Sequence, residues 1–173
     1  MQSLQVIVNA FWQIALFRAG PESLPDSRPL LVLAIAVYIA VDVVVILALY
    51  PRHALPPLLL IDVGFLLLWC AGILRVFGYA GRLQQTLTAL FGTGALLQLL
   101  AFPFSAWPSF GLPVEIPLFF RVLVALAILL WSVSVYGHIL ARAISRSMGI
   151  GLTFAIVYFI VIYEFAAQWG QVR

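Results

Sequence analysis

The chain has 173 residues, of which 65% are hydrophobic and 9% are charged. Charged residues make up about a quarter of an ordinary soluble domain, and a chain of this size cannot bury so much apolar surface in a water-soluble core. The composition therefore excludes a soluble globular protein and predicts that lipid covers most of the surface.

The net charge of +3 rests on arginine alone, because the chain contains no lysine. Such a small, dispersed excess indicates membrane topology rather than nucleic-acid binding, which requires clustered basic residues. The single cysteine, Cys70, lies inside an apolar run, so neither an intramolecular disulfide nor a cysteine metal cluster is expected.

Residues 1–20 are predicted to form an amphipathic helix in the membrane interface. One face carries a polar residue every four positions, at Gln5, Asn9 and Gln13. The opposite face is apolar, with Trp12 at its border. This pattern is typical of a helix that lies in the plane of the interface.

Residues 29–169 are predicted to form a single transmembrane domain. Five apolar runs in it are long enough to cross a hydrocarbon core of ~30 Å. They cover residues 29–50, 57–77, 86–104, 116–137 and 149–169. The predicted fold class is therefore all-α: an integral membrane five-helix bundle with an N-terminal interfacial amphipathic helix. The third run is rich in glycine, alanine and threonine, which favours close packing at the centre of the bundle.

The arginines predict the orientation of the bundle. With five spans, one side of the membrane carries Arg18, Arg28, Arg75, Arg82, Arg142 and Arg146, and the other carries Arg52 and Arg173. The richer side is expected to be cytoplasmic. We therefore expect a cytoplasmic N-terminus, an outside C-terminus and a bacterial inner membrane. Four of these arginines, with one histidine, are candidates for contact with anionic headgroups: Arg75, Arg82, His138, Arg142 and Arg146.

Charged residues inside the spans are the candidate functional residues, because burying a charge in lipid is costly. They are Asp42, Asp62, Arg121 and Glu164, from four different spans. At ~1.5 Å rise per residue, each lies within roughly 9 Å of the centre of its span, in the outer half. Gln98, in the third span, falls at a similar depth. We expect these five side chains to form a shared polar cluster.

Three interpretations of this cluster stay open. It is a structural ion-pair network that holds the bundle together, a polar surface for a partner subunit, or a pathway for protons or cations. Arg121 is the one cation available to three carboxylates, so an acid left unpaired must bind a cation, meet water or stay protonated.

The sequence contains no catalytic constellation, zinc motif, phosphate-binding glycine loop or haem attachment motif. It therefore predicts a protein that is not an enzyme and that needs no cofactor or metal.

Two segments resemble a known family. They read GYAGRLQQTLTALFGTGALLQLLAFP and LLWSVSVYGHILARAISRSMGIGL, and the similarity spans roughly residues 75–156. They are similar to the bacterial type of the Yip-domain (Ypt-interacting protein) family of five-span membrane proteins. That resemblance implies a five-helix bundle with a cytoplasmic N-terminus. The acidic, tyrosine-containing motif that eukaryotic members carry before the first span is absent, so GTPase binding is not carried over.

The predicted function is that of a non-enzymatic accessory or scaffold protein, which packs in the bilayer against another membrane protein or a second copy of itself, without nucleic acid. The alternative is a small transporter or proton or cation conduit that uses the buried carboxylates.

Overall fold

The computed structural model describes residues 2–105 and 117–170, which form helices joined by short turns. Arg173 and the expected start of the fourth span, at residue 116, lie outside these residues. Five helices are long and apolar enough to cross a membrane: α2 (Arg28–Leu49), α3 (Leu55–Val76), α4 (Leu83–Ser105), α5 (Leu118–Ala143) and α6 (Met148–Gly170). The prediction of an all-α chain with five candidate spans is confirmed.

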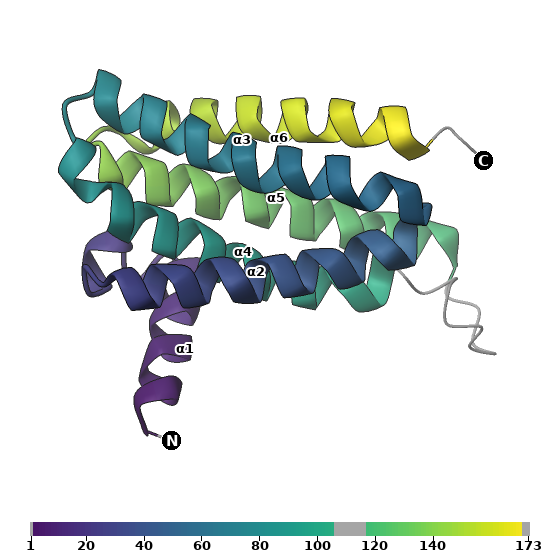
Figure 1. The fold of residues 1–173 in the computed structure, drawn as a ribbon, viewed down its shortest axis with the longest axis horizontal. Helices are drawn as coiled ribbons and strands as arrows, with labels where there is room; N and C mark the ends of the chain where they lie inside the picture. Colours follow the sequence, from purple (N-terminus) through teal and green to yellow (C-terminus); the bar gives the residue numbers. More distant parts are fainter. Residues whose placement is uncertain (1, 106–116, 171–173) are drawn as a thin grey trace.

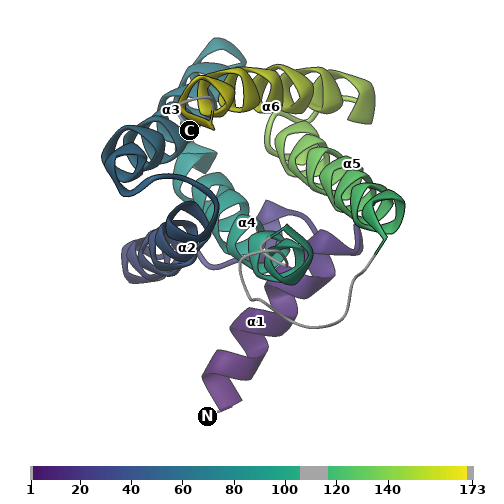
Figure 2. The same ribbon diagram turned by 90° about the vertical axis from the view of Figure 1, so that its right-hand side faces the viewer.

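The five long helices stand side by side and form a ring in the order α4, α2, α3, α6 and α5 (Figures 1 and 2). α4 is the most buried of them: 56% of its most apolar stretch is buried, against 28% or less in the other four. Glycine and alanine allow this burial because they are small enough for neighbouring helices to approach closely. Threonine can be buried because its hydroxyl bonds within its own helix, as Thr93 Oγ1 does to the Ala89 carbonyl (2.7 Å).

Proline and glycine set the ends of the spans. α3 begins with Pro56 and Pro57 in its first turn, where a missing N–H costs no helical hydrogen bond. It ends at Val76, and Gly78, two residues later, adopts φ +79° and lets Tyr79 N–H donate to the Leu74 carbonyl (2.7 Å). α5 continues six residues beyond the expected end at residue 137, so His138 and Arg142 lie on the helix rather than after it.

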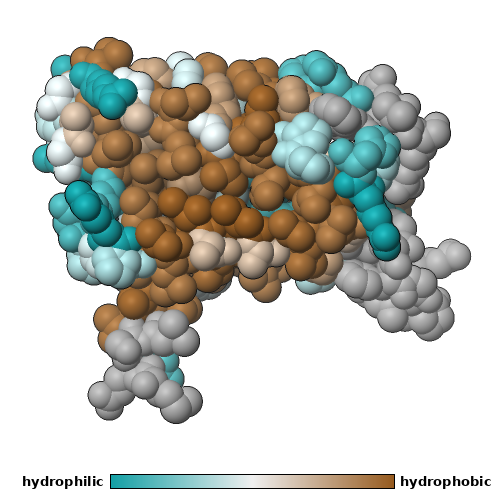
Figure 3. Space-filling view, viewed as in Figure 1, coloured by the Kyte–Doolittle hydropathy of each residue, from teal (hydrophilic) through white to brown (hydrophobic). Residues whose placement is uncertain are grey.

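Hydrophobic side chains cover the middle of the bundle, and hydrophilic ones gather at its two ends (Figure 3). We call one end the α3–α4 end, where the 3-10 helix η3 (Ala80–Arg82) joins these helices. The other is the α2–α3 end, where η2 (Arg52–Ala54) does so. Six arginines lie toward the α3–α4 end, at helix termini or in adjoining turns: Arg18, Arg28, Arg75, Arg82, Arg142 and Arg146.

α1 (Gln2–Ala15) lies at a steep angle to the long helices, and its N-terminal part projects away from the bundle (Figures 1 and 2). Its C-terminal half is buried against α4 and α5: Phe11 packs over Gly92, where a methyl group would overlap its ring. Trp131 Nε1 donates to the Ala15 carbonyl (2.9 Å). Gly92 lies nine residues into α4, or roughly 14 Å along its axis. This contact is therefore well inside the apolar length of the span.

Candidate functional site

The two halves of the bundle are packed differently. Toward the α3–α4 end, large side chains are fully buried in the interior, among them Leu66, Leu74, Phe91, Ile139 and Leu140. In the other half, residues from all five spans line a cavity of about 330 Å³. Its lining runs along α2 from Tyr38 to Leu49, which is roughly 17 Å at ~1.5 Å per residue. The cavity thus reaches from mid-bundle to the α2–α3 end.

Asp62 of α3 sits at the inner part of this cavity between two tyrosines. Tyr38 of α2 donates its hydroxyl to Oδ2 (2.5 Å), and Tyr158 of α6 donates to Oδ1 (2.7 Å). Each carboxylate oxygen therefore has a short hydrogen bond, and the three side chains tie α2, α3 and α6 together. A hydrogen bond contributes about 0.5–1.5 kcal/mol net, so the two bonds together stabilise the packing of the three helices.

Asp42 of α2, one helical turn beyond Tyr38, has a different environment. Its side chain is 5% exposed, and Gln98 Nε2 of α4 donates to its Oδ1 (3.2 Å). The other carboxylate oxygen, Oδ2, and the carbonyl oxygen of Gln98 are buried and have no hydrogen-bond partner in the described structure. Both residues line the cavity. Two acceptor oxygens are thus available there, and a donor would satisfy both.

An aromatic layer closes the inner end of the cavity. Tyr136 stacks on Tyr158 with ring centroids 5.7 Å apart, and Tyr38 makes an edge contact with Phe91 at 5.1 Å. Gly94 permits this arrangement, because a methyl group there would lie 2.5 Å from the Tyr136 hydroxyl and 2.8 Å from the Tyr38 ring. The layer separates the cavity from the packed half of the bundle.

The structure brings together three of the five residues expected in the polar cluster, Asp42, Asp62 and Gln98. Arg121 lies in the first turn of α5 and does not line the cavity. Glu164 is exposed on α6, and neither residue forms an ion pair with any described residue. The two cavity aspartates therefore have no arginine counter-ion among the described side chains.

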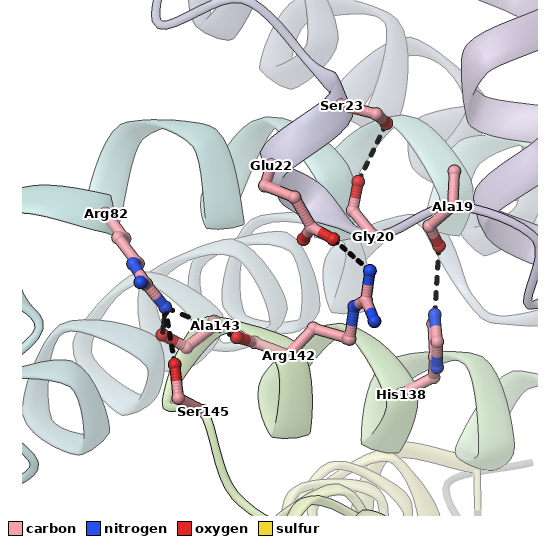
Figure 4. A network of polar contacts seen from close by, with 9 residues as sticks. All are labelled: Ala19, Gly20, Glu22, Ser23, Arg82, His138, Arg142, Ala143 and Ser145. Carbon is pink, nitrogen blue, oxygen red and sulfur yellow. Dashed lines mark hydrogen bonds and ion pairs between the residues drawn. The ribbon is translucent and has the colours of Figure 1, made fainter.

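The candidate headgroup residues lie at the α3–α4 end, and three of them have protein partners (Figure 4). Arg82 donates to the Ala143 carbonyl (3.0 Å) and to Ser145 Oγ (2.9 Å). His138 Nε2 bonds the Ala19 carbonyl (2.9 Å), and Arg142 pairs with Glu22. The contacts of His138 and Arg142 hold the segment after α1 against α5, and those of Arg82 join η3 to the C-terminal end of α5. Arg75 and Arg146 are exposed, and the Arg146 guanidinium lies over the Phe77 ring at 5.9 Å.

The pKa of Glu22 is lowered from its ordinary value of 4.5. Partial burial by itself would raise it, but the hydrogen bond from its own backbone N–H and the nearby Arg142 guanidinium outweigh burial. The carboxylate is therefore held in its ionised form beside Arg142.

Sequence reasoning missed the tyrosines and the role of Glu22. Tyr38 lies four residues before Asp42, which places both on one helix face, so this part of the site left a signal in the sequence. The sequence contains no comparable signal for Tyr158, because the approach of Tyr158 to Asp62 depends on how α3 and α6 pack. Within the described residues, no group of three metal-ligating side chains comes together.

Comparisons with known proteins gave no match to a family model, a curated protein or a solved structure. The site must therefore be interpreted from its own geometry.

Proposed function

We propose that this protein binds protons or small cations within the membrane and passes them through the cavity, with Asp42 as the group that carries the charge. The observation that supports this most directly is that Asp42, whose exposed fraction is 5%, lines a cavity that reaches the α2–α3 end, and that its buried oxygen Oδ2 has no hydrogen-bond partner among the described residues. An intramembrane carboxylate without a counter-ion is the arrangement that proton and cation pathways use. The aromatic layer blocks the far side, so transport requires a second conformation in which this layer opens.

The test is a flux assay on the purified protein in liposomes that contain a pH-sensitive dye. An imposed potassium diffusion potential should drive acidification, and Asp42→Asn should abolish it, since asparagine keeps the size of the side chain but cannot release a proton. Glu164→Gln is the matched control, because this carboxylate is exposed and lies outside the cavity lining. Equal flux in the wild type and in Asp42→Asn would refute the proposal.

An accessory or scaffold role is the second candidate function, and α1 supports it. The part of α1 that precedes Phe11 projects away from the bundle, beside the apolar length of the spans. There, Val6 is 67% exposed, and Gln5 and Asn9 are also exposed. Amide side chains in an apolar surrounding favour hydrogen bonds to another helix. Native mass spectrometry of protein extracted from its own membrane in mild detergent should then show a stoichiometric complex, and Asn9→Leu should weaken it. A monomer in both samples would exclude this role.

The orientation of the bundle in the membrane is also part of the proposal. Six arginines at the α3–α4 end support a cytoplasmic location for that end, because cytoplasmic loops are enriched in arginine. The cavity then faces the outside. A bacterial inner membrane and membership of the Yip-domain family, inferred from the resemblance over residues 75–156, are also proposals.

A further inference from the structure

The cavity has a polar inner region and apolar walls. Its free acceptors are Asp42 Oδ2 and the Gln98 carbonyl oxygen, since the Gln98 amide nitrogen is already bonded to Asp42. Toward the α2–α3 end, the lining is mostly aliphatic, with Ile46, Leu49, Leu58, Ile162 and Ala166 among it, and it also includes the hydroxyl-bearing side chains of Tyr50, Ser105 and Tyr163. A ligand that matches both regions has hydrogen-bond donors at one end and an apolar body at the other.

The charge of the site favours a cationic ligand. Two aspartates line the cavity, and no described arginine lies in the lining. Asp62 has both oxygens occupied by tyrosine hydroxyls. It therefore contributes its field, while Asp42 has an oxygen available for direct contact.

A bare metal ion fits the site poorly. Calcium takes six to eight oxygen ligands and magnesium requires six in an octahedron, whereas the cavity offers two free acceptor oxygens. Within the described residues, no group of three metal-ligating side chains is present. A primary ammonium group carries three N–H donors, which can serve both acceptors at once.

We propose that the ligand of this cavity is an amphipathic organic ammonium ion, whose ammonium group binds Asp42 and Gln98 and whose apolar body lies along α2 toward the α2–α3 end. The volume of about 330 Å³ is at the lower end of the range for small-molecule sites, so the body is that of a small aryl or alkyl amine. The inference rests on the proposed function in one respect, that Asp42 receives a positive charge, and it does not require transport.

The test measures binding of 2-phenylethylamine, protonated at neutral pH, to the full chain in lipid nanodiscs by isothermal titration calorimetry. We expect saturable binding that Asp42→Asn weakens at least about tenfold, because a hydrogen bond to a charged group is lost. Glu164→Gln should bind as the wild type does. Ala101→Phe should abolish binding, because Ala101 lines the cavity and a phenyl ring there would occupy part of its volume.

Two further probes separate the alternatives. The neutral analogue 2-phenylethanol should bind at least about tenfold more weakly than the amine, and methylammonium, which lacks an apolar body, should also bind more weakly. Each of three outcomes would overturn the inference. The first is equal affinity for the amine and the alcohol, and the second is equal affinity for the amine and methylammonium. The third is binding that is unchanged in both Asp42→Asn and Ala101→Phe. Absence of amine binding combined with a flux that depends on Asp42 would overturn this inference alone; absence of both would remove the proposed function as well.

Discussion

Asp42 and Asp62 show how two aspartates on neighbouring helices differ through their partners. Asp62 accepts hydrogen bonds from two tyrosines, one on each oxygen. Asp42 accepts one from an amide and keeps its other oxygen free. The first arrangement satisfies a carboxylate and stabilises the fold, whereas the second leaves an acceptor for a ligand or a proton. The chemistry of the site is therefore concentrated on Asp42.

A pH dependence is predicted for the contact between Glu22 and Arg142. Because the folded pKa of Glu22 is below its ordinary value of 4.5, ionised Glu22 stabilises the folded state above about pH 4.5. This contribution is lost as the pH falls through the folded pKa. Glu22→Gln should lower the Tm at pH 7 by at most a few degrees, on the order expected for an exposed ion pair. It should also reduce the loss of Tm between about pH 5 and pH 3.

The control for this prediction is Asp26→Asn. Asp26 is an exposed acid in the same connection and forms no ion pair with any described residue. Its replacement should leave the Tm and the pH profile unchanged. A Glu22→Gln profile that superimposes on the wild-type profile would show that the ion pair does not contribute to stability.

The elements are held together by close helix crossings as well as by side-chain contacts. α5 and α6 approach at Gly137 and Gly151, where a methyl group on Gly151 would overlap the backbone of Gly137 and Ala141. α3 is fixed to α6 by the hydrogen bond from Trp69 Nε1 to the Phe154 carbonyl (3.2 Å). These contacts position Tyr158 opposite Asp62, so helix packing determines the geometry of the cavity.

Gly151→Ala should therefore destabilise the protein by about 1–3 kcal/mol, since two helix backbones would have to separate. Thermal unfolding in detergent measures this. Gly149→Ala, two residues earlier on α6, is the control, because a methyl group there has no neighbour within 4 Å. Equal stability of the two variants would show that the α5–α6 crossing is looser than the structure indicates.

At the scale of the whole molecule, six arginines lie toward the α3–α4 end and the cavity reaches the opposite end. This asymmetry connects the orientation in the membrane with the side from which a ligand enters. If the arginine-rich end is cytoplasmic, the cavity is loaded from outside.

Cysteine labelling tests this orientation. Ser147→Cys, in the turn before α6, should react with a membrane-impermeant maleimide only after the cells are permeabilised, whereas Arg52→Cys, in η2, should react in intact cells. Both positions are exposed, and the native Cys70 is buried, so background labelling should be low. The reverse pattern would place the cavity on the cytoplasmic side.

Much of the fold could be predicted from the sequence, because a transmembrane helix is specified by local composition. Four of the five expected spans end within two residues of where the structure ends them. α5 is the exception. His138 and Arg142 marked the end of the apolar run, but they bond to Ala19 and Glu22, and the helix continues to Ala143.

The sequence by itself determined the number of candidate spans and the ends of four of them, since hydropathy is a property of a single helix. Only the tertiary structure decided which of the polar residues in the spans meet. Asp42, Gln98 and Arg121 were expected at similar depths, yet the first two line the cavity and Arg121 does not. The rotation of each helix about its axis and the identity of its neighbours result from packing of side chains across helices, which no single segment encodes.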